Sequence, residues 1–134
     1  MKYNLEWLLA QNSSAKRQKY LYFWGHQPTM NNEITASCFS QWWAGHPFES
    51  EGIVYQTAEH YMMAKKAQLF GDDVLFDAII AAQKPGKAKA LGRQVKGFDF
   101  HTWTANRCEI VVQGNLLKFA QHEALKRFLL QTYD

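Results

Sequence analysis

From Thr57 to its C-terminus the chain is divided into short helical segments by capping residues and helix breakers. Thr57 and Asp72 are suited to cap helix N-termini, Pro85 suits the first turn of a helix, and Gly71 is suited to end one. Helices are therefore predicted over residues 58–70, 73–83, 85–95, 102–121 and 122–131. We expect these short helices to form one packed cluster.

The N-terminal half carries the few strands that are expected. The run "YLYFW" at 20–24 is the strongest strand signal, and two or three small strands are predicted over 35–55, where extended pieces alternate with turn residues. Residues 4–11 are predicted to form a short helix, followed by a mobile connector over 12–19. The whole chain, 1–134, is predicted to be a single α+β domain, predominantly helical, with its few short strands packed on the helices.

Composition and motifs narrow the function. No run approaches the roughly 20 apolar residues that span a bilayer, and the N-terminus lacks a secretory signal, so a soluble, cytoplasmic protein is expected. Cys38 and Cys108 form no CxxC pair, and no HExxH, GxGxxG, GxxxxGK[ST] or GxSxG motif occurs. No metal, cofactor or serine hydrolase site is expected. The net charge of +3 suits a phosphorylated ligand better than a nucleic acid.

The helix predicted over 58–70 places opposite charges on one face. At helical spacing Glu59 and Lys66 lie two turns apart, flanked by Met63 and Phe70. Either they form a partly buried ion pair that closes the helix against its neighbours, or they line a pocket. The core face of the same helix is predicted to consist of Ala58, Tyr61, Met62 and Leu69.

A second line of candidates lies on the helix predicted over 102–121. Trp103, Arg107, Gly114 and Lys118 fall along one face, where a tryptophan can stack on a flat ring and a cation can meet a phosphate. Gly114 would allow something to approach the backbone closely. The alternative is a core tryptophan with basic side chains that reach out to solvent.

Positive charge gathers around the helix predicted over 85–95. Cations near a helix N-terminus oppose the helix dipole, and a bound anion would relieve that conflict. The alternative is an ordinary solvated face, because lysine and alanine are good helix formers. The cluster consists of Lys84, Lys87, Lys89, Arg93 and Lys96.

Several segments together resemble one family. "GIVYQTAEHYMMAKKAQLFGDD", "KPGKAKALGRQV", Trp103 with "NR", "KFAQH" and "LLQT" follow one another as in the YbiA-like family of the NADAR superfamily, named for NAD and ADP-ribose. The resemblance covers about Tyr20 to Thr132. It implies an N-glycosidase that separates ribose phosphate from the base in the first two intermediates of riboflavin synthesis. Other superfamily members resemble hydrolases that remove ADP-ribose from guanine, so nucleic acid is expected only as a modified substrate.

Residue by residue, the resemblance implies three site residues. Glu59 matches the motif glutamate, Lys66 the lysine of Lys-Ala, and Trp103 the tryptophan that holds the base. A carboxylate near C1′ of the sugar can stabilise the developing positive charge, bind a hydroxyl or activate water, so Glu59 is expected to be catalytic. Lys66 is expected either to tune that carboxylate or, with its pKa depressed by burial, to attack an opened sugar as an amine.

Other residues in the matching segments are expected to bind the phosphate or to complete the pocket wall. Arginine and lysine side chains donate the charged hydrogen bonds that hold a phosphate, and the aromatic residues have core packing as their alternative role. The phosphate ligands are expected to be Arg93 and Lys118, with Arg107 in reserve, and the wall Phe23, Trp24 and Trp42.

The sequence departs from the family pattern at three places. Gln41 replaces an asparagine, so its contacts would reach one methylene further, and Val111 replaces a methionine, a change expected to affect packing. The family pattern continues beyond Thr132 into a segment that contributes to the site. The alternatives are a natural short form, a trimmed chain, or groups supplied by another subunit. A nucleotide-binding module without activity is therefore a second functional hypothesis, and the oligomeric state is left open.

Overall fold

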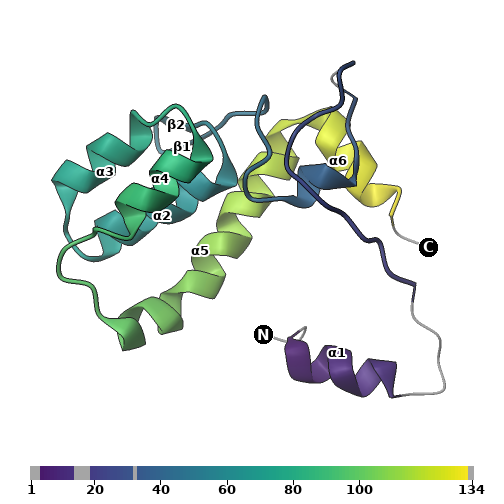
Figure 1. Cartoon of the computed structure of the whole chain (residues 1–134), viewed down its shortest axis with the longest axis horizontal. Helices are drawn as coiled ribbons and strands as arrows, with labels where there is room; N and C mark the ends of the chain where they lie inside the picture. Colours follow the sequence, from purple (N-terminus) through teal and green to yellow (C-terminus); the bar gives the residue numbers. More distant parts are fainter. Residues whose placement is uncertain (1–3, 14–18, 32, 133–134) are drawn as a thin grey trace.

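The computed structural model describes residues 4–13, 19–31 and 33–132, which form six α-helices, one 3₁₀ helix and a two-stranded sheet (Figure 1). The predicted α+β class, predominantly helical, is confirmed. The elements are α1 (Leu5–Asn12), η1 (Ala36–Phe39), β1 (Phe48–Ser50), β2 (Ile53–Tyr55), α2 (Ala58–Leu69), α3 (Asp73–Ile80), α4 (Pro85–Gly92), α5 (Phe100–Gln121) and α6 (Glu123–Leu130).

The helix boundaries follow the capping residues. Thr57 caps α2 by accepting a hydrogen bond from the backbone N–H three residues later at 3.4 Å, and Asp72 caps α3 in the same way at 3.1 Å. Gly71, with φ of 70°, ends α2. Pro85 opens α4 and holds the residue before it in an extended conformation. Helix α3 ends at Ile80, three residues before its predicted limit.

Helix α5 begins two residues before the predicted start. The side chain of Asp99 accepts a hydrogen bond from the backbone N–H of Thr102 at 2.6 Å, so Asp99 is the N-cap and Thr102 lies inside the first turn. Both residue types are good caps, and only the fold selects between them.

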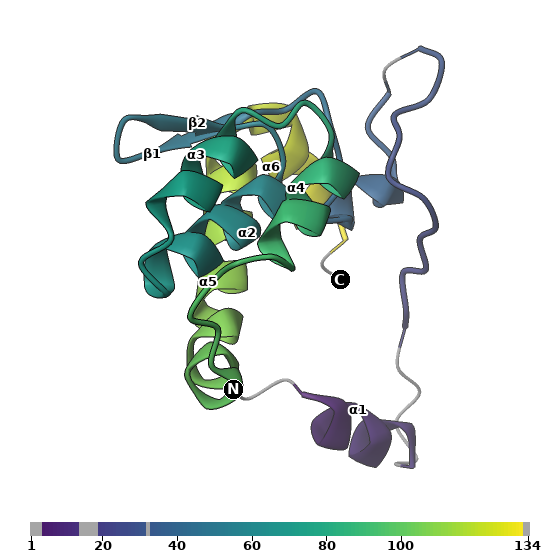
Figure 2. The same cartoon turned by 60° about the vertical axis from the view of Figure 1, so that its left-hand side comes forward.

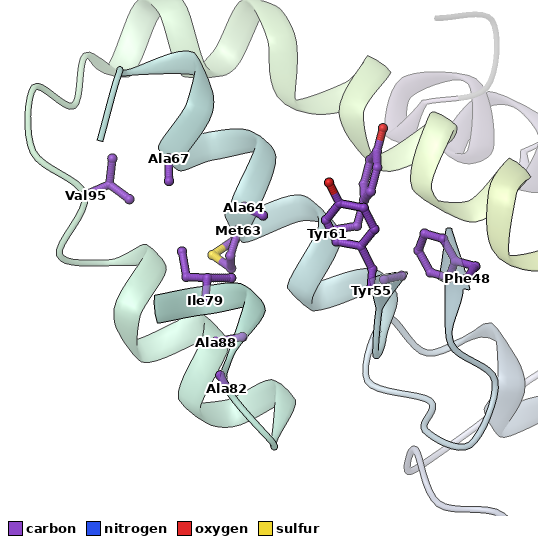
Figure 3. Close-up of a cluster of buried hydrophobic side chains, with 11 residues drawn as sticks. Phe48, Tyr55, Tyr61, Met63, Ala64, Ala67, Ile79, Ala82, Ala88 and Val95 are labelled. Carbon is purple, nitrogen blue, oxygen red and sulfur yellow. The ribbon is translucent and has the colours of Figure 1, made fainter. Parts of the chain in front are cut away.

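Helix α2 lies at the centre of the molecule, between α3 and α4 on one side and α5 on the other (Figure 2). It is buried around most of its circumference, and its side chains form a core with residues of α3, α4 and both strands (Figure 3). Leu69 was predicted to belong to the core, but it is 36% exposed because it lies in the last turn, beyond the main packing contacts. The buried residues of α2 are Ala58, Glu59, His60, Tyr61, Met63, Ala64 and Ala67.

A second, smaller apolar cluster joins η1 to the C-terminal helices. Its buried members are Cys38, Trp43, Phe119 and Leu125, so it brings the segment after η1 against α5 and α6. This cluster supports the short segment 40–47 that leads into β1. The same segment includes Gln41 and Trp42, which contact Glu59.

The strand prediction is right for the hairpin and wrong for 20–24. Strands β1 and β2 pair antiparallel through a tight turn in which Glu51 and Gly52 both have positive φ, as a type I′ hairpin turn requires. Residues 20–24 instead run extended without a strand partner, and Trp24 is 95% exposed. A run of β-formers becomes a strand only where another strand pairs with it.

Helix α1 confirms the predicted N-terminal helix, and it buries no side chain. It lies apart from the helical body in both views (Figures 1 and 2). Of the connector predicted over 12–19, residues 14–18 lie outside the described residues. None of the helices in the described part of the chain is long and apolar enough to cross a membrane.

Candidate active site around Glu59

Glu59 lies in the first turn of α2 and is only 3% exposed. Its backbone N–H donates a hydrogen bond to the carbonyl of Gln41 at 3.0 Å, which fixes the N-terminus of α2 to the segment after η1. One carboxylate oxygen, Oε1, is buried and has no hydrogen-bond partner. A buried acceptor without a partner costs free energy, so its presence here indicates a ligand or water site.

The surroundings of Glu59 set its protonation. Burial raises the pKa of its carboxyl group above 4.5, and this effect outweighs the opposing influences of Lys89, of a hydrogen bond from the Trp42 side chain, and of Arg93. Lys89 and Arg93 lie four residues apart on and just after α4. The ammonium of Lys89 also lies 5.6 Å from the ring centroid of Trp42. One buried carboxylate, two cations and an indole therefore gather at one end of α2.

Lys66 lies further along the same face of α2, about 10 Å from Glu59 by the rise of the helix. Its ammonium donates a hydrogen bond to the carbonyl of Gly92 at 2.8 Å. It also lies 4.3 Å from the ring centroid of Phe98 and 5.6 Å from that of Trp103. Burial lowers its pKa below 10.5.

Glu59 and Lys66 do not form the ion pair that the sequence left open. Both residues are described in the structure, and no salt bridge joins them. Lys66 instead uses the Gly92 carbonyl as its acceptor, so the ion-pair interpretation is wrong. Glu59 and Lys66 therefore lie on one helix face but have different neighbours.

A cavity of about 500 Å³ opens between α2 and α5 next to these residues. Trp103 and Arg107, which the sequence placed on one face of α5, both line it, and Trp103 is the ring that Lys66 approaches. Met63, which lies between Glu59 and Lys66 on α2, also lines the cavity, whereas Glu59 and Lys66 themselves do not. The complete lining is Met62, Met63, Trp103, Arg107, Cys108, Val111 and Val112.

The C-terminal half of this α5 face packs inside the protein. A side chain at Gly114 would lie 2.7 Å from the ring of Tyr61, so the group that approaches this glycine closely is Tyr61. Lys118 is 1% exposed, and its ammonium donates to the carbonyls of Cys38 at 2.5 Å and Ser40 at 3.0 Å. Burial lowers its pKa to about 8. In this structure Lys118 therefore ties α5 to η1.

The three aromatic residues proposed for the pocket wall have different surroundings. Trp42 lies beside Glu59 and Lys89, as described above. Phe23 packs edge-on against Phe39 of η1 at 6.0 Å, and the side chain of Trp24 points into solvent while its carbonyl accepts a hydrogen bond from η1. The structure thus brings only Trp42 to the carboxylate.

Sequence reasoning missed two neighbours of the site. Lys89 was part of the basic cluster but was not singled out, although its spacing of four residues from Arg93 places both on one side of α4. His26 lies 5.3 Å from Trp42 between ring centroids, and no local pattern marks it because the contact joins distant segments. Within residues 4–13, 19–31 and 33–132, no group of three or more His, Cys, Asp or Glu side chains is placed to hold a metal ion.

Comparison with known proteins identifies the family of the chain. The NADAR domain model matches residues 22–134. The chain is 40% identical over 118 residues to an N-glycosidase of Acanthamoeba polyphaga mimivirus, an alignment that covers 85% of this chain and 68% of that protein. It is 31% identical over 97 residues to an N-glycosidase of Nostoc punctiforme, which covers 72% of this chain and 62% of that protein. The chain therefore belongs to the NADAR domain family and is an enzyme of the glycosidase class.

Proposed function

We propose that this enzyme hydrolyses the N-glycosidic bond between a ribose 5-phosphate and an aminopyrimidine base, the bond found in the first two intermediates of riboflavin synthesis. The observation that carries the proposal is the buried Glu59 carboxylate. Its Oε1 atom has no partner in the protein, and two cations and an indole lie around it. The N-glycosidase relatives support the reaction class.

Glu59 supplies the chemistry at C1′ of the sugar. As the bond to the base breaks, positive charge develops on C1′, and a carboxylate in a dry site stabilises that charge strongly. The same carboxylate accepts a hydrogen bond from water, whose oxygen adds to C1′. The overall reaction consumes one water molecule. Its hydroxyl group bonds to C1′, and its remaining proton is taken up by the nitrogen of the departing base.

Lys89 and Arg93 supply the charge that binds the phosphate. Both act on Glu59 electrostatically, so both lie close enough to serve the same small substrate. Arg107, at the cavity, is the third candidate. Lys118 has a supporting role in this proposal, because its hydrogen bonds hold the backbone of η1 and Ser40.

The base occupies the cavity between α2 and α5. Trp103 offers an aromatic face there, and the lining is mainly apolar, as suits a flat heterocycle. Lys66 approaches the ring of Trp103 and binds the Gly92 carbonyl, so it orients both the stacking ring and the end of α4. The lowering of its pKa by burial favours the neutral amine, which is the form that attacks an opened sugar.

The proposal is tested by incubating the purified chain with two substrates in parallel. One is a ribosylaminopyrimidine 5′-phosphate and the other is ADP-ribosylated guanosine, and mass spectrometry detects the released base and sugar phosphate. We expect release from the first substrate. Release from the second alone would move the substrate class to ADP-ribosylated guanine, and release from neither by a folded protein would leave a binding module.

A further inference from the structure

His46 lies in the segment between η1 and β1, and it holds a buried tryptophan. The indole N–H of Trp43 donates a hydrogen bond to Nδ1 of His46 at 3.0 Å. An indole nitrogen can only donate, so Nδ1 must carry a lone pair and no proton. The observed contact therefore requires the neutral form of His46.

Trp43 is the anchor of this segment. It is 1% exposed and belongs to the apolar cluster that joins η1 to α5 and α6. Its two preceding neighbours in the chain reach the site: the carbonyl of Gln41 accepts the backbone hydrogen bond of Glu59, and the side chain of Trp42 acts on the carboxylate. Movement of Trp43 therefore moves groups that contact Glu59.

The groups around His46 oppose a positive charge on its ring. The ring of His122, at the junction of α5 and α6, lies 5.0 Å from the ring of His46 between centroids. His122 is itself fixed, since its Nε2 lies 2.7 Å from the carbonyl of Pro47 and must carry the proton of that contact. Lys118 of α5 also acts on His46. Among the described residues, none of the charged groups acting on His46 is acidic.

We propose that His46 is a pH-sensitive positioning residue for Glu59: the neutral ring holds Trp43, and with it the segment 41–43, against the site, and protonation releases that segment. Protonation of Nδ1 would face the Trp43 N–H with a second donor and would add a cation beside His122 and Lys118. The contact is thereby lost rather than weakened. The consequence for activity rests on the function proposed above, but the structural release does not.

The direction of the pH dependence follows from the surroundings of the ring. Burial lowers the pKa of His46 below 6.5, a hydrogen bond that the ring donates to the Ala44 backbone carbonyl opposes this, and His122 and Lys118 add to the lowering. The stabilisation from neutral His46 is therefore complete above 6.5, the pKa of an unperturbed ring, and is lost as the pH falls through the lowered pKa.

Nuclear magnetic resonance of the ¹⁵N-labelled full chain tests the release without any substrate. The indole N–H signals of Trp42 and Trp43, assigned by triple-resonance spectra, are followed while the pH is lowered. In the wild type both signals should shift together below about pH 6.5. In His46→Asn, whose side-chain oxygen accepts the same hydrogen bond but does not titrate, both should stay in place. Equal shifts in the variant and the wild type would overturn the proposal.

Two further variants separate titration of His46 from general acid unfolding. His122→Gln retains a donor for the Pro47 carbonyl but removes the imidazole ring that opposes protonation of His46, so it should move the Trp43 transition to higher pH. His101→Asn changes an exposed histidine at the other end of α5 and should reproduce the wild type. If the Trp43 transition occurred at the same pH in His122→Gln as in the wild type, the proposed charge coupling would be overturned, even if His46→Asn fails to fold.

Activity measurements then connect the release to Glu59. For the wild type, kcat/KM should fall about tenfold per pH unit once a single essential neutral group becomes protonated. His46→Asn should keep its rate at neutral pH and retain only the acid limb that comes from protonation of the Glu59 carboxylate. If the Trp signals move in the wild type but the acid limb of kcat/KM is the same in the wild type and His46→Asn, the release of the segment does not affect catalysis at Glu59. No activity at any pH would contradict the proposed function and leave the resonance result standing.

Discussion

At the scale of single residues, the main finding is a carboxylate that costs stability where it stands. Glu59 is almost fully buried, its Oε1 has no partner, and burial raises its pKa. A group chosen only for folding would be paired or replaced by an apolar side chain. Perturbed and unsatisfied ionisable groups gather at functional sites, and Glu59 fits that pattern.

Replacement of Glu59 by glutamine should therefore not destabilise the fold at neutral pH. The folded wild type binds the proton of Glu59 more tightly than the unfolded chain does, so its stability falls as the pH rises from the ordinary value of 4.5 through the raised pKa. Glu59→Gln removes this loss. Its melting temperature, relative to that of the wild type, should rise with pH when thermal unfolding is followed by circular dichroism.

The matched control for this comparison is Glu109→Gln, at an exposed position of α5, whose melting temperature at neutral pH should lie close to that of the wild type. If Glu59→Gln melted several degrees below the wild type at neutral pH, Glu59 would be a partner in a stabilising contact. Loss of one member of a buried pair costs on the order of 3 kcal/mol or more.

The sequence identified the charged residues of α2 but not their partners. Spacing placed Glu59 and Lys66 on one face, and the structure has them there. The acceptor for Lys66 is the backbone carbonyl of Gly92, a group that every residue carries and that no sequence pattern marks. Lys89 reaches Glu59 only because α4 packs along α2. Such contacts depend on tertiary packing, which local patterns do not contain.

At the scale of elements, one side of α4 packs on α2 and the other carries charged residues near Glu59. Its apolar side packs on α2, where a side chain at Gly92 would clash with Met63. Its other side directs Lys89 and Arg93 toward Glu59, while Lys87 is exposed. The basic cluster is thus partly a solvated face and partly a candidate anion site.

Neutralising the two cations of that site should weaken binding of a phosphorylated substrate. Lys89→Gln and Arg93→Gln should each raise KM by about tenfold or more, since a hydrogen bond to a charged group contributes about 1.5–3 kcal/mol. Lys87→Gln, on the same helix, should leave KM nearly unchanged. Steady-state kinetics with the phosphorylated substrate and its dephosphorylated counterpart measures this. Equal losses with both substrates would contradict the phosphate assignment.

The packing of α2 against α5 depends on Gly114. Alanine normally stabilises a helix interior by about 1 kcal/mol relative to glycine. Here the added carbon would lie 2.7 Å from the Tyr61 ring, and the required shift should cost about 1–3 kcal/mol. Denaturant unfolding should show a net loss for Gly114→Ala. Gly86→Ala is the control, because its nearest contact is an ordinary 3.6 Å, and a similar loss there would contradict this account.

Most elements follow from local signals, and the exceptions have a common cause. The capping side chains of Thr57 and Asp72 and the ring of Pro85 act within a few residues, so the starts of α2, α3 and α4 were predicted correctly. The strand over 20–24 was wrong because a strand needs a partner from elsewhere in the chain. Local signals determine these three helix starts, whereas the start of α5 and the pairing of strands are decided by the whole fold.

At the scale of the whole molecule, the site is assembled from segments far apart in sequence. Residues 41–42, α2, α4 and α5 converge on one region, with α2 in the middle (Figure 2). Helix α1 contributes no buried side chain, and the NADAR domain match begins at residue 22. The N-terminal residues therefore stand outside this arrangement.

A chain that begins at Lys19 should fold and act like the full chain. Because none of the residues of α1 is fully buried, its removal should leave the melting temperature and kcat/KM unchanged within error. Parallel thermal unfolding and turnover measurements on the two chains provide the comparison. A drop of several degrees, or a loss of turnover, would assign α1 a role in holding the site.

The central claim is that the Glu59 carboxylate performs the cleavage, and a single-turnover comparison tests it most directly. Wild type and Glu59→Gln, each in excess over a ribosylaminopyrimidine 5′-phosphate, are quenched at intervals and the free base is measured by mass spectrometry. We expect the variant to bind the substrate but to release base about 10²–10⁴ times more slowly. A folded variant that releases base within about tenfold of the wild-type rate would contradict the claim.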